Sequence, residues 1–182
     1  MCTVPRVEDL DLTDIDIVAI DLETSDPNLK TKGIGAVRND GFVTGIAIAT
    51  KKQTFYFPIQ HAHTDNLPIK KTWDYLNEKL FKNKDIRKIF HNAMYDVCWI
   101  RSAIGHMPQG QLLDTMIAAS VIDETRMRYS LDAISKDYLK ESKYKYDLAE
   151  KSLAECGIKD PMSNMHKLPY SLVKDYAEQD VN

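Results

Sequence analysis

The sequence has little cysteine and no long apolar run. Its 182 residues include three cysteines, Cys2, Cys98 and Cys156, and no CxxC pair. An odd number at wide spacing is not typical of a disulfide framework, which agrees with a reducing cytoplasm. The apolar runs, such as residues 17–20, are far shorter than the ~20 residues that span a bilayer. With no leader evident at the start, these absences argue against membrane, secreted and fibrous classes.

The sequence also lacks a strong charge of one sign. It has 24 Lys and Arg against 27 Asp and Glu, a formal net charge of -3. This is not the basic footprint of a domain that binds DNA by charge alone, but nucleic acid remains possible as a substrate of a carboxylate-rich metal site. Because no repeat, low-complexity tract or Pro/Gly/Ser linker divides the chain, we expect one domain over residues 1–182, with residues 1–14 as an N-terminal extension.

Hydrophobic patterning predicts an α/β fold. A β-branched run predicts a buried strand that ends at Asp21, and a loop is expected at residues 25–40. The other expected strands are residues 42–50, 54–59 and 87–90. The expected helices are residues 68–81, 93–104 (closed by Gly105), 112–122, 130–139 (capped by Ser130) and 169–181. Residues 140–165 are polar, with weak helical periodicity around residues 148–153.

Two carboxylates, Asp21 and Glu23, lie two residues apart at the expected end of the first strand. Alternate residues of a strand point to the same face, so both carboxylates are expected on one side of the sheet. Such a pair repels unless protons or cations neutralise it. The DxD pairs at 9–11 and 14–16 end no apolar strand and are interpreted as solvated charge. A helix cap or a surface pair is the alternative interpretation of Asp21 and Glu23.

Two further carboxylates lie at helical spacing from polar partners. Asp96 precedes the apolar run Val97–Ile100 and lies one turn after Asn92. A charged aspartate in so apolar a helix needs a partner. Asn92 as a simple helix cap is the alternative. Tyr176 and Asp180 are four residues apart and share a helix face, and a core tyrosine beside a solvated aspartate is the alternative there.

Together the four carboxylates predict a metal site. Oxygen ligands without nearby cysteines or paired histidines suit Mg²⁺ or Mn²⁺ rather than zinc. Two such ions about 3.5–4 Å apart can generate a hydroxide, align it and stabilise the leaving oxygen of a phosphodiester. The expected ligands are Asp21, Glu23, Asp96 and Asp180.

In this order, the motifs Asp21-Leu-Glu23, Asn92-x-x-x-Asp96 and Tyr176-x-x-x-Asp180 resemble the DEDD superfamily of 3′-5′ exonucleases, in its tyrosine-containing, DnaQ-like DEDDy branch. Further strings resemble the proofreading domain of family A DNA polymerases, and of the phage enzymes in particular: residues 20–25, 45–49, 56–61, 113–116 and 130–134. The resemblance covers about residues 15–181. It implies a ribonuclease H-like fold, with a mixed sheet of about five strands flanked by helices.

The resemblance also implies roles in catalysis. Asp21, Glu23 and Asp180 would hold one divalent cation, and Asp21 would bridge to a second that Asp96 supports. Tyr176 would orient the attacking water through its hydroxyl group. The implied activity is that of a 3′-5′ exodeoxyribonuclease, the editing domain of a polymerase, which releases 5′-mononucleotides from single-stranded or frayed 3′ ends of DNA.

Four residues would contact the 3′-terminal nucleotide by the same resemblance: Leu22, Thr24, Asn92 and Met94. A core role is the alternative for Leu22 and Met94, and Asp114 matches a family position that is interpreted as structural.

In the family the last helix continues past its aspartate and a polymerase domain follows, whereas this sequence stops at Asn182. A truncated editing domain is therefore expected, with Asp180 in a fraying turn and weakened metal binding.

Two other functions compete with this one. A ribonuclease D-like exoribonuclease shares the DEDDy residues, although the polymerase-like strings favour DNA. A non-catalytic module that binds single strands is the second, but carboxylates that nothing neutralises would cost stability.

Among the remaining features, His61-Ala-His63 is interpreted as solvated loop, the lysines of 82–88 as phosphate contacts or solvated surface, and Trp73 and Trp99 as core.

Overall fold

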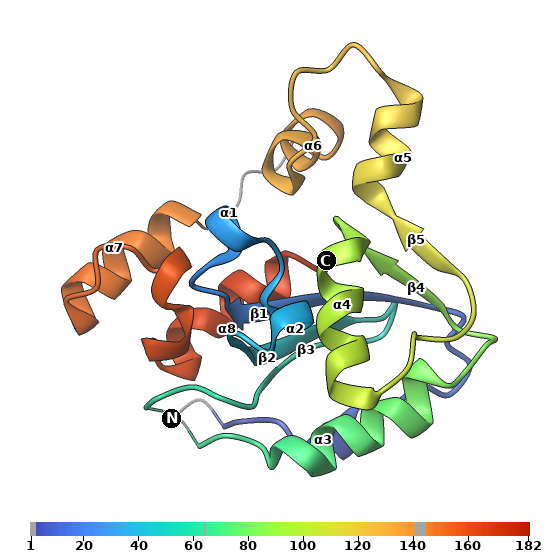
Figure 1. Ribbon diagram of the computed structural model, residues 1–182, viewed down its shortest axis with the longest axis horizontal. Coiled ribbons are helices and arrows are strands. Elements are labelled where there is room, and N and C mark those ends of the chain that lie inside the picture. Colours follow the sequence, from blue (N-terminus) through green and yellow to red (C-terminus); the bar gives the residue numbers. More distant parts are fainter. Residues whose placement is uncertain (1–2, 64, 141–144) are drawn as a thin grey trace.

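The computed structural model describes residues 3–63, 65–140 and 145–182 and contains a five-stranded sheet between two layers of helices (Figure 1). The strand order is β3-β2-β1-β4-β5. Strand β2 is antiparallel to β1 and β3, whereas β4 is parallel to β1 and to β5. The strands are β1 (Ile17–Ser25), β2 (Phe42–Ala49), β3 (Thr54–Pro58), β4 (Arg87–Phe90) and β5 (Leu112–Asp114). This mixed sheet confirms the expected fold class.

Helices α4, α6 and α8 begin and end close to where the sequence predicts, whereas α7 lies in the segment 140–165, where only weak periodicity is visible. Helix α4 ends at Gly105, which has a φ of 81°, and Ser130 caps α6 by accepting a hydrogen bond from the Ala133 amide. The α-helices are α1 (Leu29–Lys32), α2 (Gly35–Arg38), α3 (Ile69–Leu76), α4 (Ala93–Ile104), α5 (Thr115–Ile122), α6 (Leu131–Tyr138), α7 (Lys145–Cys156) and α8 (Tyr170–Gln179). Three shorter turns are η1 (Val7–Asp9), the π-helical η2 (Asn77–Phe81) and η3 (Met162–Lys167).

Three predicted boundaries are wrong. Strand β1 does not end at Asp21 but continues to Ser25, because β2 pairs with it as far as Phe42. The expected loop at residues 25–40 contains the short helices α1 and α2. The predicted helix 112–122 begins with a strand, since residues 112–114 pair with β4. A short apolar run fits either state by its periodicity, and here the open edge of β4 decides for strand.

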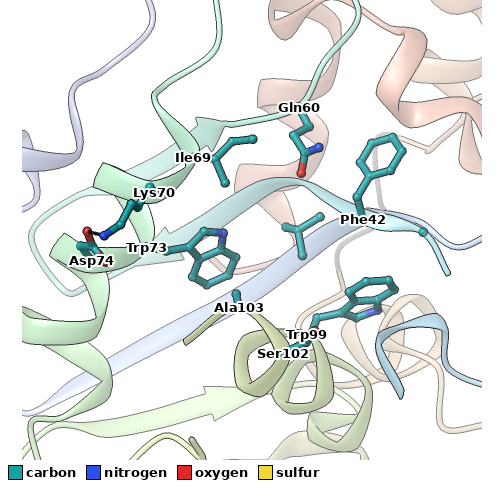
Figure 2. A pocket seen from close by; sticks show the side chains of 11 residues that line it. Phe42, Gln60, Ile69, Lys70, Trp73, Asp74, Trp99, Ser102 and Ala103 are labelled. Carbon is teal, nitrogen blue, oxygen red and sulfur yellow. Dashed lines mark hydrogen bonds and ion pairs between the residues drawn. The ribbon is translucent and has the colours of Figure 1, made fainter. Parts of the chain in front are cut away.

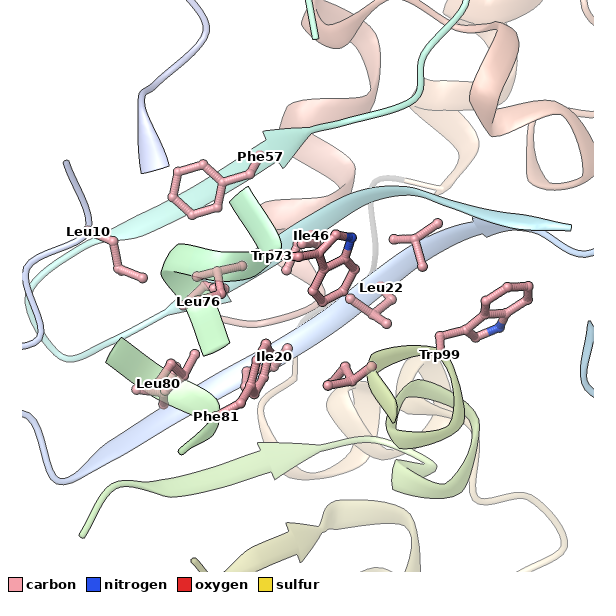
Figure 3. Packing of buried hydrophobic residues seen from close by; sticks show 14 of the residues in the cluster. Leu10, Ile20, Leu22, Ile46, Phe57, Trp73, Leu76, Leu80, Phe81 and Trp99 are labelled. Atoms are coloured by element: carbon pink, nitrogen blue, oxygen red, sulfur yellow. The ribbon is translucent and has the colours of Figure 1, made fainter. Parts of the chain in front are cut away.

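One face of the sheet packs against α3, η2 and α4 (Figure 3). Alternate residues of β1, namely Val18, Ile20 and Leu22, are buried on this face. Trp73 of α3 and Trp99 of α4 belong to the same core, as predicted. The N-terminal extension is part of this packing too, because the side chains of residues 7 and 10 are buried in the core.

The opposite face of the sheet carries small side chains where α8 lies over it. Ala19, Ala47 and Ala49 form this surface together with Gly45, which pairs with Glu23. A Cβ atom at position 45 would lie 2.1 Å from the Tyr56 hydroxyl, so no side chain fits there. Small residues let a helix approach a sheet closely. The carboxylates of β1 point to this face, by the alternation of the strand.

Helices α5 and α6 extend beyond the end of β5, away from the sheet (Figure 1). In the three described ranges, no helix combines the length and the apolar character needed to cross a bilayer.

Candidate active site

Three carboxylates from two elements meet at the α8 face of the sheet. Asp21 and Glu23 project from β1, and Asp180 directly follows the last residue of α8. One oxygen atom of each carboxylate lies within 4.8 Å of the other two, and all three residues are partly buried. The structure thus brings together three of the four carboxylates that the sequence predicts to be metal ligands.

The fourth carboxylate, Asp96, reaches β1 from the other helix layer. The pairing of β1 with β4 stops at Ala19 and Ile89, so β1 has no strand partner on that side beyond this point. Asp96 is buried on α4, and its Oδ1 atom accepts a hydrogen bond of 3.1 Å from the Leu22 amide. The Asp96 side chain therefore has a hydrogen-bond partner, as its apolar sequence context requires.

Burial and nearby charge both act on Asp96. Burial raises its pKa well above the usual range, and the charge of Asp21 raises it further, against the opposing effect of the Leu22 hydrogen bond. Asp96 and Asp21 are therefore close enough to interact electrostatically. The four carboxylates form one negative region that extends through β1 from α8 to α4.

Tyr176 lies beside this negative region. Its side chain is buried in the core between α8 and the sheet. The pKa of Tyr176 is raised by that burial and then by the charges of Asp180, Glu23 and Asp21. The hydroxyl group therefore stays protonated at neutral pH. Tyr176 is thus a core tyrosine, as the alternative expected, but Asp180 beside it is partly buried rather than solvated.

The residues expected at the terminal nucleotide differ in their exposure. Asn92 and Met94 are exposed, with 72% of Met94 accessible, so the core alternative for Met94 is wrong. Leu22 is only 5% exposed and packs in the core, so its side chain is not available to a base and the core alternative holds.

Thr24 follows a bulge in β1, where the register with β2 shifts between Glu23 and Thr24. Bulges re-aim side chains and are frequent beside active sites. The Thr24 hydroxyl lies 2.6 Å from that of Tyr95 on α4, a residue that the sequence interpretation passed over. Its position directly before Asp96 is the signal that could have identified it.

A buried polar cluster anchors α8 and was also missed. His61 is buried, not solvated as predicted, while His63 is exposed. The Nδ1 atom of His61 lies 2.9 Å from the Leu168 carbonyl, which can only accept, so Nδ1 carries the proton. Its Nε2 atom therefore accepts from the Tyr56 hydroxyl at 2.7 Å. Burial lowers the pKa of His61 to about 4, which keeps this tautomer neutral.

The far end of α8 is attached to β3 as well. Glu178 Oε1 accepts a hydrogen bond of 3.2 Å from the Tyr56 amide, on the outer edge of the sheet. Tyr56 thus contacts both ends of the helix that positions Tyr176 and Asp180, since its ring also stacks on Tyr170 in the first turn, with ring centroids 6.1 Å apart. No spacing in the sequence indicates this contact, because it joins residues more than one hundred positions apart.

One lysine of the basic run 82–88 has neither of its predicted roles. Lys88 is fully buried in β4, and its Nζ atom donates to the carbonyls of Asn83 and Gln109. Burial lowers its pKa to about 8. Lys88 therefore ties two loops together rather than contacting phosphate or solvent.

Two cavities lie on different sides of the sheet. One, of about 510 Å³, is bounded by β1, β4, α5 and α6 and includes Asp21 and Asp180 among its lining residues. The other, of about 530 Å³, lies between α3, α4 and the start of β2, where Trp73 and Trp99 point toward it (Figure 2). Only the first of these two adjoins the carboxylates.

The carboxylate set suits a divalent cation with oxygen ligands. At 4.8 Å, two carboxylates repel by about 0.9 kcal/mol with the screening of bulk water, and by about 3.5 kcal/mol near a protein surface. Three such pairs within a partly buried site strongly favour a bound positive charge. Oxygen donors of this kind are those that Mg²⁺ and Mn²⁺ bind, so the residues present fit such an ion.

Comparisons with known proteins agree with this geometry. A family model described as 3′-5′ exonuclease matches residues 9–182. A DNA-directed DNA polymerase of Pseudomonas phage M6 is 33% identical over 168 residues, and a DNA polymerase DpoZ of Salmonella phage PMBT28 is 29% identical over 169 residues. Each alignment covers 90% of this chain and 24% of the relative. The chain therefore spans about a quarter of the length of these relatives.

Solved structures share this fold as well. Trypanosoma brucei RNase D in complex with GMP has a TM-score of 0.68 at 19% identity, over 93% of this chain and 48% of that chain. Brucella melitensis NrnC bound to pGG has a TM-score of 0.63 at 25% identity, over 94% and 69%. The sheet and its flanking helices form the ribonuclease H-like fold of these proteins. The chain belongs to the 3′-5′ exonuclease family, which is a family of hydrolases.

Proposed function

We propose that the chain is the proofreading domain of a phage DNA polymerase and removes nucleotides one at a time from the 3′ end of DNA. The observation that carries this proposal is the meeting of Asp21, Glu23 and Asp180 within 4.8 Å, beside Asp96 and Tyr176. The similarity to phage DNA polymerases over 90% of this chain supports DNA as the substrate. The domain would act in the cytoplasm of the infected host, as part of the longer polymerase.

The carboxylates would divide into two sets. Asp21, Glu23 and Asp180 would hold one divalent cation, and Asp96 would join Asp21 at a second. When bound, the two cations would acidify an attacking water molecule and offset the charge that develops on the phosphate. The hydrogen bond from the Leu22 amide fixes the direction of the Asp96 carboxylate, so its second oxygen has a defined position.

Tyr176 would position the attacking water. A phenol that stays protonated can both donate and accept a hydrogen bond, so it can orient a water molecule without taking its proton. The raised pKa of Tyr176 keeps it in this form at neutral pH. Asn92 and Met94, both exposed at the start of α4, would contact the terminal nucleotide.

The test uses two 5′-labelled single strands of the same sequence, one of DNA and one of RNA, with Mg²⁺ or Mn²⁺. A ladder that shortens from the 3′ end of the DNA, and that is abolished by chelator or by Asp21→Asn, is the expected result. Asp16→Asn is the matched control, because Asp16 is exposed and forms an ion pair with Arg87 at 2.6 Å. Internal cuts or shortening from the 5′ end would contradict the proposal.

The same experiment decides between DNA and RNA. The folds of RNase D and of NrnC bound to pGG favour an exoribonuclease as the second candidate. Faster shortening of the RNA strand than of the DNA strand would establish that alternative. Binding to DNA that persists in chelator, with no shortening at any metal concentration, would instead indicate a non-catalytic binding module.

A further inference from the structure

Helix α4 begins with a residue that does not cap it. Asn92 occupies the N-cap position, but its backbone is left-handed, with φ of 66°, and its side chain makes no capping hydrogen bond. Asparagine is among the best N-cap residues, and its side chain normally bonds the amides of the first turn. The simple capping role expected as the alternative for Asn92 is therefore not what the structure has.

A carboxylate from another element takes this place. Asp114 Oδ2 accepts a hydrogen bond of 2.8 Å from the Ala93 amide, and its Oδ1 accepts one of 3.1 Å from the Asn92 amide. The parallel pairing of β4 with β5 sets Asp114 beside Phe90, two residues before Asn92. Asp114 is thus placed at the start of α4 by the register of the sheet.

The same carboxylate also caps the helix that it precedes. Asp114 is the N-cap residue of α5, and its Oδ1 atom accepts from the amides of Met116 at 2.8 Å and Ile117 at 3.3 Å. One side chain therefore holds the first turns of two helices. Removing its charge affects both helices at once, because Oδ1 accepts from Asn92 at the start of α4 as well as from Met116 and Ile117 in α5.

We propose that Asp114 is a positioning residue, which by capping α4 in place of Asn92 leaves the side-chain carboxamide of Asn92 for the substrate and fixes the direction of Asp96. This inference rests on the proposed function. Asp96 lies one turn after Asn92, and its contact with the Leu22 amide requires the start of α4 to stay at its present distance from β1. A loosened first turn moves a substrate contact and a metal ligand together.

Asp114→Ser separates this role from simple capping. Serine caps its own helix about as well as aspartate does, so the α5 cap is kept. Its shorter side chain with a single oxygen atom does not also reach the amides of α4. The matched control is Ser130→Ala, which removes the cap of α6 without touching the carboxylates. Thermal melts of both variants establish that each is folded.

Two measurements that do not depend on turnover test the proposal. Calorimetric titration with Mn²⁺ and fluorescence anisotropy of a labelled single-stranded DNA in chelator should each show binding about tenfold weaker for Asp114→Ser, the usual effect of losing a partner that orients a ligand. Ser130→Ala should bind both as the wild type does. Wild-type affinity of Asp114→Ser for Mn²⁺ and for DNA would overturn the proposal.

The failure of the proposed function is distinguishable from the failure of this inference. If the wild-type protein shortens no DNA, the proposed function fails, while the Mn²⁺ titration still decides whether Asp114 positions Asp96. If the wild type is active and Asp114→Ser binds Mn²⁺ and DNA normally, only the role of Asp114 is refuted.

Discussion

Replacing Asp21 with asparagine should make the metal-free protein more stable. Asp21 is one of three carboxylates whose oxygen atoms lie within 4.8 Å of one another, so neutralising it removes two of three repulsive pairs. With the screening of bulk water the gain is about 2 kcal/mol, and near a protein surface it rises to about 7 kcal/mol. Because the three residues are partly exposed, we expect a value near the lower end.

The magnitude is large enough to measure by thermal unfolding. For a chain of this length, about 2 kcal/mol corresponds to a rise in Tm of about 4–8 °C. The melts should be recorded at neutral pH, once in chelator and once with saturating Mg²⁺. Magnesium should raise the Tm of the wild type, since it binds the folded state, and should have little effect on Asp21→Asn.

Asp16→Asn is the matched control for this experiment as well. Asp16 precedes β1, and its carboxylate attracts Arg87 rather than repelling other acids. Neutralising it removes a surface ion pair, for which we expect a loss of at most about 1 kcal/mol. If Asp21→Asn were destabilised in chelator as much as this control, or were still stabilised by Mg²⁺ as the wild type is, the electrostatic reasoning would be refuted.

Three further predictions follow from other parts of the site. Tyr176→Phe should lower the single-turnover rate about 10²-fold and leave the Mg²⁺-induced rise in Tm unchanged, because only an orienting hydroxyl group is lost; an unchanged rate would exclude the role of Tyr176. The stability of the wild type should fall by about 3 kcal/mol as the pH drops from 6.5 to about 4, because unfolding lets the neutral His61 take up a proton, and urea titrations of His61→Gln should lack this slope. Gly45→Ala should cost about 3 kcal/mol in urea unfolding, since its Cβ would lie 2.1 Å from the Tyr56 hydroxyl, and wild-type stability would contradict the packing described.

The parts of the site that the sequence predicts are those that local periodicity determines. Two-residue alternation places Asp21 and Glu23 on one face, and four-residue spacing places Asp180 near Tyr176. The meeting of these pairs required the resemblance to a family, because the packing of α8 on β1 depends on long-range contacts. The first and last residues of α4 were predictable from its apolar pattern and from Gly105, which ends the helix.

Other features could not be predicted, because pairing between distant residues decides them. The extension of β1 to Ser25 depends on its partner β2, and the strand at residues 112–114 depends on the open edge of β4. Asp114 precedes an apolar helix and resembles an ordinary cap, so its contact with α4 is invisible in the sequence. In the sequence His61 looks like a solvated loop residue. Its burial depends on hydrogen bonds to the Leu168 carbonyl and the Tyr56 hydroxyl, which the sequence does not indicate.

The central claim is that the carboxylates of β1, α4 and the end of α8 bind the cations on which hydrolysis depends. Anomalous diffraction from crystals grown with Mn²⁺ tests it most directly, since it locates the ion without reference to activity. We predict a strong peak enclosed by Asp21, Glu23 and Asp180, and a second beside Asp21 and Asp96 when a 3′-terminal nucleotide is present. Ordered Mn²⁺ elsewhere on the protein, with none at these carboxylates, would contradict the account.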